Sequence, residues 1–135
     1  MTVMDQPSHP LVEPLRKAYE AMVRGEFEPM RRLFWPDCVL HIPGATPLSG
    51  EIHGWDEAVK WAAKTFERGG RTYSEDIISI VATDRWAFMF TTYRAEREGR
   101  KVEDRCVNVY RLRDGRVAEM WVLVGDERAF NKIYG

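Results

Sequence analysis

The stretch Lys101–Asp126, KVEDRCVNVYRLRDGRVAEMWVLVGD, decides the fold. Its centre is Asp114-Gly115, and Asp-Gly between two runs of strand-forming residues is a strong signal for a β-hairpin. The second run, Val117–Val124, is apolar at nearly every position, with Glu119 as its single charge. A strand that is apolar on both faces is covered on both. The sequence therefore predicts a central hairpin with helices over one face and a partner subunit, or a curled part of the same sheet, over the other.

Upstream of this hairpin the hydrophobic period changes from that of helices to that of strands. Apolar residues at spacings of three and four predict helices over residues 11–23, 27–34 and 55–66. The expected strands before the hairpin are 39–42, 71–82 and 85–97, with a long loop over 43–54 and a short helix over 127–133 after the hairpin. Helices followed by a meandering sheet indicate an α+β fold, with the helices packed on one face of a strongly curved antiparallel sheet. The open end of such a sheet is a natural small-molecule pocket.

Composition narrows the class of protein. The length of 135 residues predicts one domain, over residues 9–135, after a disordered lead-in over residues 1–8. The net charge of −1 gives no electrostatic reason to expect nucleic-acid binding. No apolar run approaches the roughly 20 residues of a membrane span, and no basic and apolar leader precedes the first helix. We therefore expect a cytoplasmic protein that binds neither nucleic acid nor membrane.

Two residues are the first candidates for chemistry. Asp126 follows the apolar last strand, and a carboxylate in an apolar setting can act as a general base or acid near neutrality. The alternative is that Asp126 only caps the helix that follows. His41 lies between Leu40 and Ile42, so strand alternation points it away from these apolar neighbours. It would face the cavity only if the sheet were lined on both sides, and otherwise it is a structural histidine.

The remaining candidates would bind a substrate. Asn108 and Tyr110 share one face of the hairpin's first arm, where an amide and a hydroxyl can hold a carbonyl or an oxyanion; the same face could equally be the outer, half-wet one. Further candidates, with core, interface or loop packing as the alternative, are Trp61, Tyr73, Trp121 and His53. The histidines and the two cysteines, Cys38 and Cys106, lack metal-ligand spacing, so no metal site is expected.

Several motifs of other enzyme classes are missing from the sequence. There is no glycine-rich phosphate loop after a strand and no nucleophile elbow around a serine. Hydride and phosphoryl transfer are therefore disfavoured, and no cofactor is expected. Proton-transfer chemistry or plain binding remains.

A family resemblance rests on four segments: His41–Gly44 (HIPG), Pro47–Gly50 (PLSG), His53–Ala58 (HGWDEA) and Arg113–Trp121 (RDGRVAEMW) with the following Asp126. Together they resemble the SnoaL-like branch of the nuclear transport factor 2 (NTF2)-like superfamily, from about Leu11 to the end of the chain. The resemblance implies a cone-shaped, cystatin-like α+β fold and commonly a homodimer formed through the outer face of the sheet. The superfamily includes ketosteroid isomerases, polyketide cyclases, dehydratases, epoxide hydrolases and pockets without known activity.

The resemblance also bears on the site residues. In the cyclases an acidic residue near the end of the last strand is the acid–base group, and Asp126 stands at the matching place. His41 matches a histidine that is frequent in this branch. The tyrosine and paired acids of the steroid isomerases have no counterparts here. Asp104 and Arg105 are adjacent and so point to opposite faces, unlike the Asp-Arg-Asp set of the epoxide hydrolases.

Two functions follow as hypotheses. The first is a cofactor-independent enzyme of the cyclase or isomerase type, in which Asp126 moves a proton, His41 assists, and Asn108 or Tyr110 holds the oxyanion of a small, mostly apolar carbonyl compound. The second is a non-catalytic, dimeric binding module whose pocket holds a hydrophobic ligand.

Overall fold

The computed structural model describes residues 9–68 and 72–135. Its helices are α1 (Val12–Val23), α2 (Glu28–Arg31), α3 (Trp55–Arg68) and α4 (Glu127–Tyr134). Its strands are β1 (Phe34–Ile42), β2 (Gly50–His53), β3 (Ser74–Ala82), β4 (Trp86–Arg97), β5 (Arg100–Arg113) and β6 (Arg116–Val124). The expected lead-in over residues 1–8 lies outside the described residues, as does Arg71 at the start of the second expected strand, 71–82.

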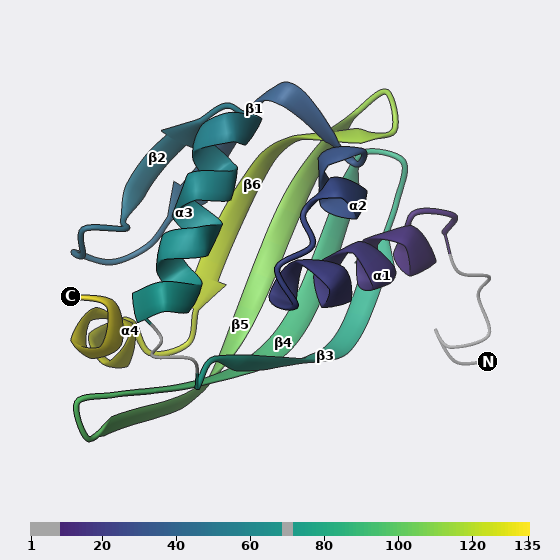
Figure 1. Cartoon of the computed structure of the whole chain (residues 1–135). Helices are drawn as coiled ribbons and strands as arrows, with labels where there is room; N and C mark the ends of the chain where they lie inside the picture. Colours follow the sequence, from purple (N-terminus) through teal and green to yellow (C-terminus); the bar gives the residue numbers. More distant parts are fainter. Residues whose placement is uncertain (1–8, 69–71) are drawn as a thin grey trace, which may run out of the picture.

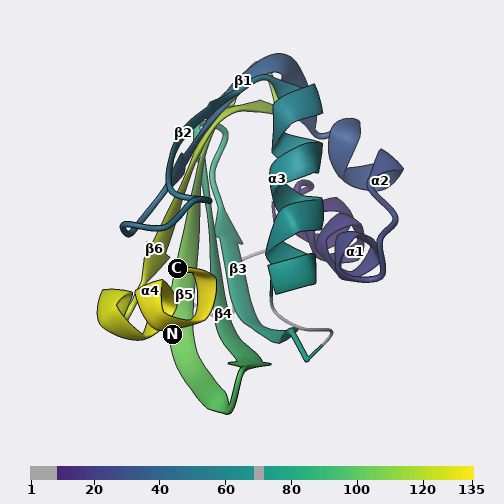
Figure 2. The same cartoon turned by 60° about the vertical axis from the view of Figure 1, so that its left-hand side comes forward.

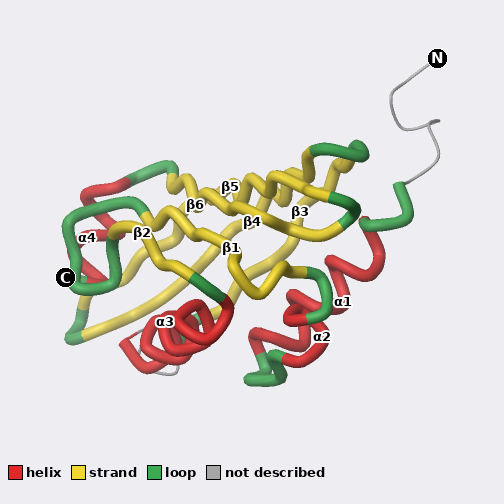
Figure 3. Tube along the Cα trace, turned by 90° about the horizontal axis from the view of Figure 1, so that it is seen from above, coloured by secondary structure: helices red, strands yellow, loops and turns green. Residues whose placement is uncertain are grey.

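Helices α1, α2 and α3 lie together against one face of a curved sheet, and α4 lies across the end of the sheet at which β6 finishes (Figures 1 and 2). Seen from above, the sheet forms one layer and these three helices form a second (Figure 3). This arrangement follows from amphipathic helices, whose apolar faces, such as Leu15 and Ala18 of α1, are buried against the sheet. The predicted α+β architecture is therefore confirmed.

The described strands form one sheet in the order β2-β1-β6-β5-β4-β3. Strands β3, β4, β5 and β6 are an antiparallel meander, as expected, and β1 pairs with β6 in parallel. The turn between β5 and β6 is the predicted one: Asp114 and Gly115 have φ of 50° and 78°, the left-handed conformations that a tight hairpin turn requires. The doubly apolar β6 thus lies in the middle of the sheet, between β1 and β5.

Three expected elements differ from the structure: the second helix, the strand after it and the long loop. The helix expected over 27–34 is confined to Glu28–Arg31, because Phe34 already pairs with Val117 as the first residue of β1. Pro36 lies inside β1, where the register with β6 is interrupted between Phe34 and Val39, and a proline is tolerated at such an irregularity. The long loop over 43–54 contains a short edge strand, β2, paired with β1.

Among the described residues, no helix is long and apolar enough to cross a membrane.

Candidate functional site

A cavity of about 90 Å³ lies between the helices and the concave face of the sheet. Its walls come from α1, α2, α3, α4 and the inward faces of β1, β3, β4, β5 and β6. The lining residues are Tyr19, Met22, Phe27, Met30, Phe34, Leu40, Trp55, Ala58, Val59, Trp61, Ala62, Thr65, Tyr73, Glu75, Tyr93, Cys106, Asn108, Tyr110, Met120, Val122, Val124, Phe130 and Tyr134. Ten of these 23 side chains are aromatic.

Strand pairing explains why these side chains converge. Thr91 on β4 pairs with Cys106 on β5, and Cys106 pairs with Val124 on β6, so one row of residues crosses the inward face. Asn108 pairs with Val122 in a neighbouring row. Residues directly opposite one another in adjacent strands share a face of the sheet. The curvature of the sheet turns this face into the concave wall of the cavity.

Glu75 on β3 brings a carboxylate into this apolar wall. Its Oε1 atom accepts hydrogen bonds from the hydroxyls of Tyr19 on α1 and Tyr73 just before β3. Its Oε2 atom accepts a hydrogen bond of 2.6 Å from the hydroxyl of Thr91, a fully buried residue of β4. A carboxylate offers about four acceptor sites. Three hydroxyl donors therefore hold Glu75 in place and leave one site of Oε2 free.

The charge of Glu75 acts on several groups around the cavity. Burial, followed by the charge of Glu75, raises the pKa values of Tyr19 and Tyr73 well above the ordinary value of a phenol. The same two causes raise the pKa of Tyr110 and Tyr134, and burial with the charge of Glu75 raises the pKa of Cys106 to about 12. The surrounding hydroxyls and thiol are therefore neutral at physiological pH, so they add no second negative charge to the cavity.

Four of the predicted binding residues line this cavity. Asn108 and Tyr110 are buried on the inward face of β5, so of the two alternatives for this face the pocket is the one observed. Trp61 reaches the cavity from α3, and Tyr73 lies beside Glu75. Their positions in the wall are compatible with binding, and their roles in binding stay predictions.

Asp126 does not line the cavity. Its side chain is exposed and accepts a hydrogen bond of 3.0 Å from the backbone N–H of Ala129, which makes it the N-cap of α4. The expectation that Asp126 opens onto an apolar interior is therefore wrong, because the chain leaves the sheet at Gly125 and turns outward into α4. Its catalytic role stays a prediction that the geometry does not favour.

His41 and Trp121 lie on the other, convex face of the sheet. Leu40 faces the cavity, and His41 therefore points outward, where its ring stacks on Trp121 at 5.1 Å and 9°. The His41 Nε2 atom lies 2.5 Å from Glu119 Oε2, and Arg111 Nε donates to the other oxygen of Glu119 at 3.2 Å. The hydrogen bond from His41, together with that from Arg111, holds the pKa of Glu119 below its usual range.

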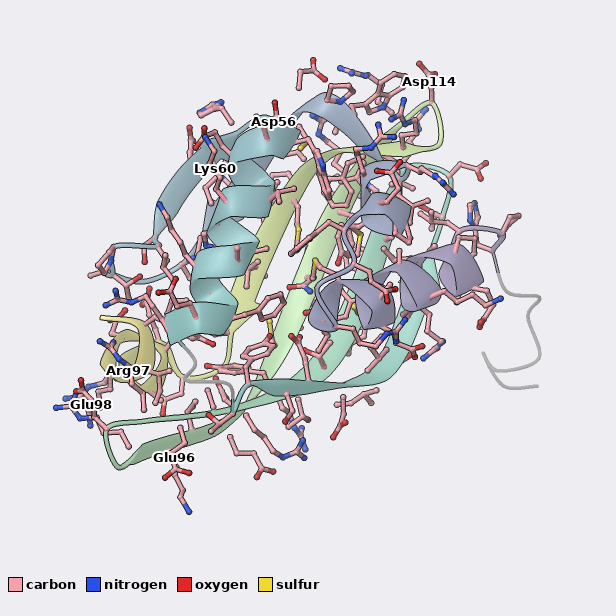
Figure 4. The ribbon with its side chains drawn as sticks, viewed as in Figure 1. Asp56, Lys60, Glu96, Arg97, Glu98 and Asp114 are labelled. Atoms are coloured by element: carbon pink, nitrogen blue, oxygen red, sulfur yellow. The ribbon has the colours of Figure 1, made fainter. Side chains whose placement is uncertain are left out.

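His53 is exposed at the end of β2 and is absent from the cavity wall. Other charged side chains are exposed at the periphery: Asp56 and Lys60 lie on α3, and Asp114 lies at the turn between β5 and β6 (Figure 4). Cys38 and Cys106 are buried free thiols, as expected. In residues 9–68 and 72–135, no group of three or more His, Cys, Asp or Glu side chains is arranged to hold a metal ion.

Comparison with known proteins agrees with this architecture. Residues 15–120 match the model of the SnoaL-like domain. The chain belongs to the SnoaL-like family. One similar structure is that of wild-type IdmH from Streptomyces antibioticus, a suggested polyketide cyclase. It has a TM-score of 0.67 at 24% identity, over 87% of this chain and 93% of IdmH.

Two further proteins are similar to this SnoaL-like chain. Bal32a, from a soil-derived mobile gene cassette, superposes with a TM-score of 0.84 at 21% identity, over 91% of this chain and 95% of Bal32a. The uncharacterized protein Rv0034 of Mycobacterium tuberculosis is 25% identical over 118 residues, which are 85% of this chain and 88% of that protein. The predicted superfamily and the NTF2-like fold are therefore confirmed, and the SnoaL-like domain supports a small-molecule-binding fold.

Sequence reasoning missed Glu75, the one charged side chain in the wall of the cavity as the structure describes it. A signal was present: Tyr73, Glu75 and Ile77 alternate along one strand, which places a carboxylate on the same face as an aromatic and an aliphatic residue. A lone acid on an apolar strand face is unusual, because burying a charge is costly unless hydrogen bonds or ions compensate it.

Proposed function

We propose that this SnoaL-like protein is a cofactor-independent acid–base enzyme of the cyclase or isomerase type, acting on a small, mostly apolar carbonyl compound. The observation that carries the proposal is the Glu75 carboxylate, held by three hydroxyls inside an aromatic-lined cavity. A positioned carboxylate with a free acceptor site can take a proton from a carbon next to a carbonyl group. Glu75 thus takes the place that the sequence suggested for Asp126.

The proton moves in a balanced step. A C–H bond next to the carbonyl breaks and the proton passes to Oε2 of Glu75. The electron pair of that bond forms the C=C bond of an enolate, and the π pair of the carbonyl moves onto its oxygen. The proton then returns to another carbon in an isomerisation; in a cyclisation the enolate carbon attacks a second carbonyl, and the alkoxide that forms takes the proton back from Glu75. The Tyr110 hydroxyl and the Asn108 amide, both buried in the wall, are the donors for the enolate oxygen.

Two unpartnered donors also favour a ligand with carbonyl oxygens. The indole N–H of Trp61 and the hydroxyl of Tyr134 are buried and have no hydrogen-bond partner among the described residues. Leaving a buried donor unsatisfied costs about 1–3 kcal/mol. A ligand oxygen, or water in its absence, would remove that cost.

The test follows hydrogen–deuterium exchange of 2-indanone, a compact apolar ketone, in D2O by NMR. We expect the wild-type protein to accelerate exchange next to the carbonyl and Glu75→Gln to lose about 100-fold or more of that acceleration. Asp126→Asn is the matched control, because this exposed carboxylate caps α4 and should leave the rate within about twofold. Full exchange activity in a folded Glu75→Gln protein, or its loss in Asp126→Asn, would refute the assignment of the proton acceptor.

The second candidate function is a non-catalytic binding module for a hydrophobic ligand. It is favoured by the cavity wall, in which Glu75 is accompanied almost entirely by aromatic and aliphatic side chains. Saturable binding of 2-indanone without any acceleration of exchange would support this function over the enzymatic one.

We further infer that the protein forms a homodimer through the convex face of the sheet. Large apolar side chains are exposed there, including Leu123 at 51% and Phe90 and Trp86 at 38%. Contiguous exposed apolar surface is typical of an interaction site. Light scattering should give twice the mass of the chain and Leu123→Glu should shift it towards the monomer; a monomeric wild-type protein would contradict the inference. The cytoplasmic location and the absence of a nucleic-acid partner stay predictions.

A further inference from the structure

The cavity carries a negative charge without a positive one. Glu75 is the single charged side chain in the described part of its wall, and no ion pair in residues 9–68 and 72–135 includes Glu75. Its partners are the hydroxyls of Tyr19, Tyr73 and Thr91. Hydroxyl groups orient a carboxylate and stabilise it, but they leave its net charge in place.

The field of this charge extends across the cavity. Besides its direct partners, Glu75 disfavours the ionised forms of Tyr110, Tyr134 and Cys106, which lie on β5 and α4. A potential that disfavours a negative charge at these positions favours a positive one to the same degree. The low polarity of the wall strengthens both effects, because water screens them poorly there.

The wall also offers surfaces that attract a cation. Ten of the 23 lining residues are aromatic, and they include Trp55, Trp61 and Phe34, with the rings of Phe34 and Trp55 at 5.3 Å. The face of an aromatic ring carries partial negative charge and attracts an ammonium group within about 6 Å. Glu75 Oε2 has one free acceptor site, since Thr91 occupies the other.

We propose that the cavity binds small apolar amines in their ammonium form, with an N–H group donated to Oε2 of Glu75 and the charge held against the surrounding aromatic rings. The volume of about 90 Å³ is smaller than the about 150 Å³ of a cavity that binds benzene, so the ligand is a small amine whose ammonium end, and not a whole ring, lies inside the cavity. This goes beyond the proposed function, because it concerns the binding of a charged molecule and needs no turnover.

The test compares three probes of nearly the same shape: benzylamine, benzyl alcohol and benzoate, which are cationic, neutral and anionic at neutral pH. Titration calorimetry on the wild-type protein should give an affinity for benzylamine about tenfold or more above that for benzyl alcohol, and no measurable binding of benzoate. NMR shift changes should fall on Tyr19, Tyr73 and Trp61. Equal affinities for benzylamine and benzyl alcohol, or shift changes confined to the convex face, would overturn the proposal.

Two variants test whether the charge of Glu75 causes the preference for benzylamine. Glu75→Gln keeps the shape of the side chain and removes the charge, so the preference for benzylamine over benzyl alcohol should fall to about twofold or less. Glu119→Gln is the matched control, since Glu119 is a glutamate of the same sheet on the convex face, bound to His41 and Arg111. It should keep the wild-type preference. If the preference survives in Glu75→Gln, the proposal fails whether or not exchange of 2-indanone is catalysed, so the two proposals fail separately.

Discussion

The hydrogen bond between Thr91 and Glu75 gives a quantitative test of the inner site. Thr91 is fully buried, and its hydroxyl lies 2.6 Å from Glu75 Oε2. Valine has nearly the same shape, so Thr91→Val opens no cavity and keeps a β-branched residue in the strand. A hydrogen bond to a charged group contributes about 1.5–3 kcal/mol. Because the change also removes the cost of desolvating the hydroxyl, we expect the free energy of unfolding to fall by about 1–2 kcal/mol.

A double-mutant cycle tests whether the loss of stability in Thr91→Val comes from its hydrogen bond to Glu75. Urea denaturation would be measured for the wild type, Thr91→Val, Glu75→Gln and the double variant. We expect a coupling energy of about 1–2 kcal/mol, so that Thr91→Val costs little once the carboxylate is gone. Thr92→Val, a partly buried position on the opposite face of the same strand, should stay within about 0.5 kcal/mol of the wild type. If Thr91→Val costs the same with and without the Glu75 carboxylate, the inferred hydrogen bond does not stabilise the protein.

Two further predictions concern the periphery of the sheet. His41 and Arg111 lower the pKa of Glu119, so the ionised form of Glu119 stabilises the fold above the ordinary glutamate pKa, and this contribution is lost as the pH falls through the lowered value. Urea unfolding at neutral pH should therefore show that Glu119→Gln is less stable than the wild type. The difference in the free energy of unfolding should vanish at strongly acidic pH. Asp126→Ala removes the N-cap of α4 and should lower the free energy of unfolding by about 0.5–2 kcal/mol, whereas Asp126→Asn should cost only a fraction of that in the same assay.

The parts of the fold that the sequence predicted are those encoded locally. The hairpin between β5 and β6 follows from Asp114-Gly115, whose left-handed backbone can be foreseen from residue type. The start of β1 could not be foreseen in this way. Phe34 fits the helical spacing of residues 27–34, but it pairs with Val117, which is distant in sequence, and the parallel pairing of β1 with β6 overrides the local pattern.

The alternation of residues along a strand does not predict which face of the sheet lines the cavity. Alternation showed that Asn108 and Tyr110 share a face, yet only the curvature of the sheet and the packing of α1 and α3 decide that this face is concave. Asp126 was favoured because it follows an apolar strand. The direction in which the chain leaves that strand is set by Gly125 and the start of α4, so the carboxylate reaches solvent.

The two glutamates on opposite faces of the sheet explain why the inner one is the candidate for function. Glu119 on the convex face has Arg111 and His41 as partners, so the positive charge of the guanidinium offsets its negative charge and the group serves the surface of the fold. Glu75 on the concave face has three hydroxyls and, among the described residues, no cationic partner. Hydroxyl donors make a half-buried carboxylate tolerable without neutralising it. An uncompensated charge that faces an aromatic cavity attracts cationic ligands, because neither a protein cation nor bulk water offsets it there.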